Sequence, residues 1–143
     1  MRALCVKQPY ASWLVYGRYL DGKFVYKTIE ARSWGTNYRG PVVVCASKKV
    51  DGLAMPVQPS AAEARQYELR GVALGVVTLY GVRPLAFEDE ARAMVRPKRG
   101  EELQAWEVRA PQPFKRPFPV DGQLGLFDLD DARVQAALEG AAR

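Results

Sequence analysis

The pattern of apolar and polar positions predicts a protein built mainly from β-strands. Six segments show either the alternation of a half-buried strand or the continuous apolar run of a fully buried one: residues 2–6, 26–34, 41–47, 71–85, 103–109 and 124–130. We expect 71–85 to be the longest strand. Gly71, Gly75 and Gly81 lie in it, and glycines are positions where a sheet bends or bulges.

Three segments have the pattern of short helices. Residues 9–20 begin with a proline, which suits the first turn of a helix. Residues 60–69 begin with Ser60, and Glu63 three positions later completes a capping box. Residues 131–143 predict a last helix that frays at its end.

Two segments lack a regular pattern. Residues 87–100 are polar and mixed in charge, typical of a long loop or a short helix, and residues 110–123 contain four prolines and predict an irregular crossover. Together the elements indicate an α+β fold, a small β-barrel of about six strands with two or three short peripheral helices. The length of 143 residues suggests one domain over residues 1–143.

Targeting and membrane signals are absent from the sequence. The longest apolar stretch, residues 72–82, is interrupted by Thr78 and two glycines and is far shorter than the roughly 20 residues of a membrane helix. The first ten residues lack the apolar region of a signal peptide. We therefore expect a cytoplasmic protein without a membrane partner, with Cys5 and Cys45 as reduced core thiols.

The chain contains no histidine. This excludes serine and cysteine triads that depend on histidine, and it leaves too few ligand types for a common zinc site. We expect neither a metal nor a cofactor, so any chemistry must use Lys, Glu, Asp, Tyr, Cys or an ordered water.

Charge is distributed unevenly along the chain. The net charge is +5, but residues 1–50 carry +7 and the remaining residues carry −2. Such an imbalance indicates one basic surface that faces an acidic partner, of which nucleic acid is the commonest.

The strongest candidate for chemistry is a group of three ionic residues, Lys27, Glu30 and Arg32. Glu30 and Arg32 are two positions apart on a predicted strand, so they share a face at a separation of about 7 Å. Lys27 has odd spacing and reaches the same cavity only from a loop end or a bulge. If they converge, two cations keep Glu30 ionised, Arg32 clamps a phosphate, and a desolvated Lys27 becomes a base or nucleophile. The alternative is a purely structural ion cluster, which is disfavoured because desolvation often cancels its Coulomb gain.

Eight further residues are candidate ligand contacts because they place cations, amides or aromatic rings at turns and strand ends: Lys7, Gln8, Pro9, Trp34, Tyr38, Arg39, Ser47 and Lys48. The first three form the turn before a helix start, where backbone amides favour anions. Trp34 and Tyr38 flank a glycine-bearing loop beside Arg39, a pattern typical of base stacking. Ser47 and Lys48 end a buried strand and could form another wall of the cleft.

Five segments in order resemble an ASCH domain of the PUA-like superfamily: KQPYASWLVYG, KTIEARSW, YRGPVVVCAS, GVALGVVTL and WEV with PFKRPFPVDGQLGLF. The family's hallmark is a glycine followed shortly by Lys-x-x-Glu-x-Arg, and Lys27, Glu30 and Arg32 match it. The sequence departs from this pattern by an insertion, RYLDGKFVY, between Gly17 and Lys27.

The resemblance implies a PUA-like barrel of about six strands with a cleft beside the first helix, and RNA or related ligands. Some similar domains are amidohydrolases on modified cytidine, and others are reported as ribonucleases. The amidohydrolases have a threonine three positions after the lysine, where this chain has Glu30, and this departure argues against simple transfer of that activity.

Three functions therefore stay open. The first is a module that binds RNA, single-stranded nucleic acid or a nucleotide or nucleoside, and the second is a metal-independent, histidine-free hydrolase in the same cleft, with Lys27, Glu30 and Arg32 as catalytic residues. The third is a protein-interaction domain. The sequence does not distinguish RNA from DNA or from a free nucleoside, and it does not fix the oligomeric state.

Overall fold

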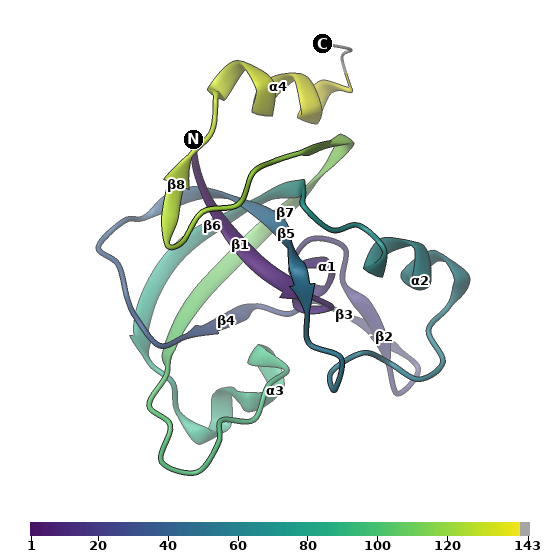
Figure 1. The fold of residues 1–143 in the computed structure, drawn as a ribbon. Coiled ribbons are helices and arrows are strands. Elements are labelled where there is room, and N and C mark those ends of the chain that lie inside the picture. Colours follow the sequence, from purple (N-terminus) through teal and green to yellow (C-terminus); the bar gives the residue numbers. More distant parts are fainter. Residues whose placement is uncertain (141–143) are drawn as a thin grey trace.

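Six strands form one curved sheet in the computed structural model, which describes residues 1–140 (Figure 1). The strand order is β4-β7-β6-β5-β1-β8, and all neighbours are antiparallel except β1 and β5, which are parallel. The strands are β1 (Arg2–Gln8), β4 (Ile29–Arg32), β5 (Gly40–Val50), β6 (Val72–Pro84), β7 (Gln104–Pro119) and β8 (Leu126–Asp128). Figure 1 shows the long strands β6 and β7 bending together across the molecule.

The sheet is open, so the expected closed barrel is not confirmed. Within residues 1–140, β4 pairs only with β7 and β8 pairs only with β1, which makes these two strands the edges. Strand β8 is short, and its pairing with β1 ends where Leu126 lies opposite Leu4. From Cys5 onwards this side of β1 has no ladder partner among the described strands, and the curvature of the sheet brings β4 opposite it. A side chain of β4 bridges the two, because Arg32 donates a hydrogen bond to the carbonyl oxygen of Cys5.

Glycines and register shifts produce the curvature, as the sequence predicted. The pairing of β6 with β7 shifts register between Ala73 and Gly75 and again between Leu79 and Gly81. At Gly75 a Cβ would lie 2.6 Å from the carbonyl oxygen of Gln112 and 2.7 Å from a methyl carbon of Val15, so only glycine allows this close approach.

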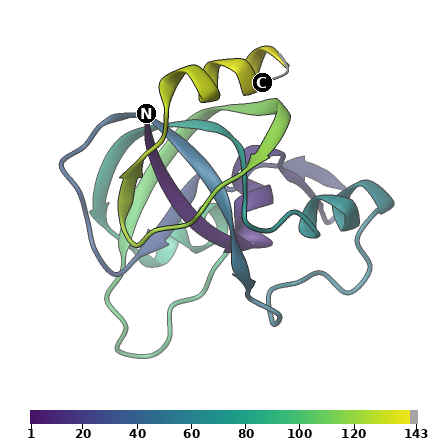
Figure 2. The same ribbon diagram turned by 45° about the horizontal axis from the view of Figure 1, so that its top comes forward.

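Two apolar clusters lie on the two faces of the sheet. One contains Leu14 and Val15 of α1 (Tyr10–Val15) together with Leu74 and Trp106 of the long strands. The other contains Val134 of α4 (Asp131–Glu139), and Figure 2 shows α4 lying across the sheet near the N-terminus. This packing of helices on both faces leaves the gap between β1 and β4 as the open side of the fold.

Four α-helices and one 3-10 turn accompany the sheet within residues 1–140, against the two or three helices expected. Besides α1 and α4 they are α2 (Ala61–Tyr67), η1 (Phe87–Asp89) and α3 (Glu90–Ala93). The capping box of Ser60 and Glu63 is confirmed at the start of α2. The frayed end expected for the last helix falls on residues 141–143, which lie outside the described residues.

The expected irregular crossover at 110–123 is wrong for residues 110–119, because β7 continues to Pro119 and is longer than β6, and it holds only for residues 120–123. Prolines fit there for a physical reason. Strand β4 covers β7 only from Gln104 to Glu107, so beyond this point β7 pairs on one side only, and an edge tolerates a missing N–H. Ala110, in the left-handed region at φ 54, marks the break between the two parts of the strand.

The helix expected over residues 9–20 is too long. It ends at Val15, and the insertion after Gly17 forms a separate two-stranded hairpin of β2 (Arg18–Leu20) and β3 (Lys23–Val25). Asp21 and Gly22 form the loop of this hairpin, since Leu20 lies opposite Lys23.

Among residues 1–140, no helix is both long enough and apolar enough to cross a membrane. Cys5 and Cys45 are free thiols and directly paired neighbours on β1 and β5. Cys45 is buried in the core as expected, whereas Cys5 is only partly buried.

Candidate functional site

Lys27, Glu30 and Arg32 form a continuous chain of charges. The Nζ atom of Lys27 lies 3.5 Å from Oε1 of Glu30, and the Nε atom of Arg32 lies 3.0 Å from Oε2 of the same carboxylate. Each oxygen of Glu30 therefore faces one cation, and the three residues meet as the sequence predicted.

The local backbone explains how three residues of unequal spacing converge. Glu30 and Arg32 are alternate residues of β4 and so share a face. Lys27 precedes the strand, and its N–H donates to the carbonyl oxygen of Trp13 on α1 at 3.0 Å. Lys27 thus lies in the irregular segment directly before β4, and its side chain reaches the cavity from this loop end, one of the two expected routes.

Burial gives this group its chemical character. Lys27 is 2% exposed and Glu30 is 8% exposed. The Lys27 ammonium also donates to the carbonyl oxygen of Ala93 at the end of α3 and lies 5.2 Å from the centre of the Tyr10 ring. Desolvation lowers the pKa of Lys27, the charge of Glu30 opposes this effect, and the charge of Arg32 adds to it. Lys27 is thus a lysine whose proton is held less firmly than that of an exposed one.

A cavity of about 430 Å³ opens in front of these charges, between β4 and the unpaired part of β1. Its charged lining residues are Lys7, Lys27, Glu30 and Arg32, so it has more cationic than anionic groups. The remaining wall consists of Leu4, Cys5, Tyr10, Ala31, Trp34, Ser47, Val95, Gln123, Leu124 and Gly125. The cavity combines apolar walls with a few convergent polar groups, which is typical of a small-molecule site.

Trp34 forms a rigid wall of this cavity. Its backbone oxygen accepts a hydrogen bond of 2.9 Å from the indole of Trp106, and the two rings meet edge to face with centroids 4.8 Å apart. Trp106 is 1% exposed and belongs to the core, whereas Trp34 is partly exposed. A fixed, half-open indole of this kind can stack on a nucleobase.

Of the other candidate contacts, Lys7 and Ser47 also line this cavity, whereas Gln8 and Pro9 do not. Gln8 is fully buried, and its side-chain amide donates to the backbone oxygens of Gln66 and Leu69 and accepts from the N–H of Ser12. Gln8 thereby connects β1, α1 and the end of α2. The anion site expected at the helix start has one donor fewer, because the N–H of Ser12 already donates to the side-chain oxygen of Gln8.

Tyr38, Arg39 and Lys48 lie outside the first cavity. The Tyr38 hydroxyl donates to the carbonyl oxygen of Pro41, and Arg39 donates to that of Thr36, so both side chains brace their own loop. Arg39 borders a separate shallow hollow with Thr36, and Lys48 lines a second cavity next to the first.

Sequence reasoning missed Tyr10, Cys5 and the segment 123–125 as parts of the site. The Tyr10 hydroxyl donates to Asp51 at 2.8 Å, and burial followed by this carboxylate raises the pKa of Tyr10. The sequence offered a signal only for Tyr10, which follows the predicted Lys7–Pro9 turn directly. The other contacts arise from strands distant in sequence. No group of three or more Cys, Asp or Glu side chains placed to hold a metal ion occurs within residues 1–140.

Comparison with known proteins gives one family and one fold. A family model described as the ASCH domain matches residues 4–118. The structure is similar to that of ASCH from Zymomonas mobilis, with a TM-score of 0.61, 14% sequence identity and coverage of 99% of this chain and 96% of that one. It is also similar to a tyrosine-to-phenylalanine mutant of the Zymomonas mobilis protein, with a TM-score of 0.59, 14% identity and coverage of 96% of each chain. Comparison with curated protein sequences finds no match.

Proposed function

Since this chain belongs to the ASCH domain family, we propose that it binds single-stranded nucleic acid, or a nucleotide fragment, in the cavity between β1 and β4. The family is generally linked to RNA binding. The observation that carries the proposal is the placement of a carboxylate between two cations, nearly buried, on the wall of a cavity with a net positive lining.

The desolvation cost of Lys27 and Glu30 supports a role in function, rather than in stability alone, for this group of charges. Removing the charged side chains of Lys27 and Glu30 from water costs several kcal/mol for each ion, and apolar residues of similar volume often stabilise a fold equally well. The Glu30 carboxylate borders a cavity that is open to a ligand, so its polar atoms have a use beyond closing the sheet.

The chemistry of the walls matches a nucleotide. Glu30 offers carboxylate oxygens to the amino group of a base, and Trp34 offers a ring for stacking. Arg32 and Lys7 supply positive charge for a phosphate, Arg32 in a planar fork that suits bidentate contact. A volume of about 430 Å³ lies within the range of small-ligand sites, about 300–1,000 Å³.

The test is a titration of short single-stranded RNA oligomers, followed by fluorescence anisotropy at several salt concentrations. With three or four phosphate contacts, log K should fall against log salt with a slope of roughly −2 to −3. Arg32→Ala should weaken binding at least tenfold, whereas Arg116→Ala, an exposed residue of β7 outside the cavity walls, should not. An affinity that does not respond to salt would reject the proposal.

A hydrolase in the same cavity is the second candidate, either a ribonuclease or an amidohydrolase on a modified cytidine-like nucleoside. The observation that favours it is the burial of Lys27 with a lowered pKa beside Glu30, a pairing that suits acid–base catalysis without histidine. In this reading Glu30 activates a water and Arg32 stabilises the developing negative charge.

Glu30→Gln separates the two candidates. A binding module should hold its ligand about as well as before, because glutamine keeps one side-chain oxygen that can accept from a base amino group and removes a negative charge near the phosphate. A hydrolase should keep the ligand and lose turnover by about a hundredfold or more, as expected for a missing acid–base group. Undiminished product formation by Glu30→Gln would exclude Glu30 as the base.

A further inference from the structure

A second cavity of about 440 Å³ adjoins the first. The two share four wall residues, Cys5, Ser47, Gln123 and Leu124. The second is bounded further by Ala46, Lys48, Lys49, Gly71, Val120, Asp121 and Gly122. Its lining has two lysines and one carboxylate, so it too is positive.

The segment 121–125 between β7 and β8 borders both cavities. It passes close to Cys5, because a Cβ added at Gly122 would lie 2.9 Å from the sulfur of Cys5. Leu124 is fully exposed at 100%, so it presents an apolar side chain to solvent beside both openings. The two cavities are therefore neighbouring parts of one groove along the end of β1.

A bulge in β5 gathers the cations of this groove. Val6 lies opposite Ala46 and Gln8 lies opposite Val50, so Lys7 alone faces the three residues 47–49. An excess of residues in one strand redirects its side chains, and bulges commonly occur beside functional sites. Here the bulge places Ser47, Lys48 and Lys49 beside Lys7, near the end of β1.

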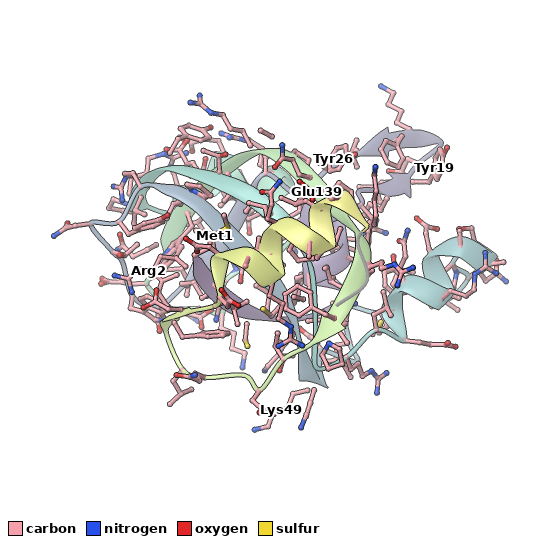
Figure 3. All side chains as sticks on the ribbon, turned by 90° about the horizontal axis from the view of Figure 1, so that it is seen from above. Met1, Arg2, Tyr19, Tyr26, Lys49 and Glu139 are labelled. Atoms are coloured by element: carbon pink, nitrogen blue, oxygen red, sulfur yellow. The ribbon has the colours of Figure 1, made fainter. Side chains whose placement is uncertain are left out.

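Two of the bulge residues are held in place. The Ser47 hydroxyl accepts a hydrogen bond from the N–H of Lys49 at 3.2 Å. The side chain of Lys48 lies along Gly71, where a Cβ would be 3.3 Å from Cε of the lysine. Figure 3 shows Lys49 at the edge of the molecule, on the side away from Tyr19 and Tyr26, so this groove is separate from the exposed aromatic residues around the β2–β3 hairpin.

We propose that the two cavities form one site for at least two consecutive nucleotides of a single strand. The nucleoside enters the first cavity, the linking phosphate lies over the bulge near Lys7, Ser47 and Lys48, and the neighbouring nucleotide occupies the second cavity. This rests on the proposed function of the first cavity and specifies its ligand as at least two linked nucleotides rather than a single nucleotide fragment. The positive lining of both cavities and the shared wall carry the proposal, since a free nucleoside has no phosphate for the bulge to bind.

The experiment compares, by isothermal titration at low salt, the four common ribonucleosides with the four matching homodinucleoside monophosphates. The best dinucleotide should bind at least tenfold more tightly than its nucleoside. The double variant Lys48→Ala with Lys49→Ala should lose most of this gain and keep nucleoside affinity within twofold. The control double variant Lys98→Ala with Arg99→Ala, an exposed pair outside both cavity walls, should change neither.

The outcomes distinguish this inference from the proposed function. If nucleosides bind and dinucleotides show no gain, the two-cavity site is refuted and the first cavity keeps its role. If the gain persists in the lysine double variant, the second cavity is not where the strand continues. If neither nucleosides nor dinucleotides bind, the proposed function fails and this inference with it.

Discussion

Arg32 on β4 donates a hydrogen bond to the backbone oxygen of Cys5 on β1, and this contact joins two strands that share no ladder within residues 1–140. The same guanidinium lies 3.0 Å from Glu30. One side chain thus holds the two walls of the first cavity together and neutralises the carboxylate inside it. Both the stability of the fold and ligand binding in the first cavity should therefore depend on Arg32.

Arg32→Ala should lower the free energy of unfolding by about 1–3 kcal/mol, because Glu30 keeps only Lys27 as a partner and a buried carbonyl oxygen loses its donor. Urea denaturation measures this change. Arg39→Ala is the control, since Arg39 is exposed and contacts only backbone oxygens of its own loop, and it should cost less than about 0.5 kcal/mol. Equal effects of the two substitutions would show that the bridge to β1 contributes nothing.

Lys27→Met should alter how stability depends on pH. The pKa of Lys27 is lower in the folded protein than in the unfolded chain, so the unfolded chain binds more protons between the two values. The free energy of unfolding of the wild type should therefore rise relative to Lys27→Met as pH increases towards the ordinary pKa of lysine. The slope can reach about 1.4 kcal/mol per pH unit, the value for one proton.

Urea midpoints of both proteins from pH 7 to about 9.5 provide the measurement. This range stops below the ordinary pKa of tyrosine, since Tyr10 and Tyr16 have raised pKa values and would lower stability above it. Parallel pH profiles for the two proteins would contradict a lowered pKa for Lys27.

Gly75→Ala should destabilise the fold by about 1–3 kcal/mol through overpacking. Its new methyl group would meet the backbone of Gln112 and the side chain of Val15, and the backbone cannot move aside. Gly52→Ala is the matched control because no atom lies within 4 Å of its new Cβ, so thermal unfolding should show little change. A stable Gly75→Ala variant would mean that β6 and β7 do not approach as closely as described.

Cys5 should react with iodoacetamide much faster than Cys45. The pKa of Cys5 is lowered by a hydrogen bond from the Cys45 thiol, by the N–H of Gln123 and by the nearby charge of Arg32. The pKa of Cys45 is raised by its interaction with the Cys5 thiol and by burial. Mass spectrometry of peptides after brief labelling near pH 7 distinguishes the two sites. A bound nucleotide should protect Cys5, which borders both cavities, and labelling of Cys45 first would reverse the assignment.

Sequence pattern predicted the elements whose signals are local. The Ser60–Glu63 capping box, the glycine bends of β6 and the shared face of Glu30 and Arg32 all follow from spacing within a few residues. The sequence pattern gave wrong predictions where the structure of a segment depends on which strands pair with it. Four prolines suggested an irregular segment, yet β7 tolerates them because one side of it is free.

The same distinction between local signals and long-range contacts applies to the residues of the candidate site. The three charges were recognisable from their spacing, but Cys5, Tyr10 and segment 123–125 join them only through folding. The bulge in β5 was hidden because residues 48–50 resemble a polar loop, and its position depends on the register with β1. Gln8, chosen as a ligand contact, became a connector between helices once the core formed around it.

Strand β8 begins only at Leu126, and this late start has a consequence for the hollow beside β1. Gly125, in the left-handed region at φ 71, turns the chain away from β1 just before the ladder begins. If pairing continued for two more residues, Gly125 and Leu124 would lie against Cys5 and Val6, and backbone would fill the hollow that now faces β4. The hollow beside β1 therefore exists because the ladder between β1 and β8 is short, and a final strand that began two residues earlier would close it.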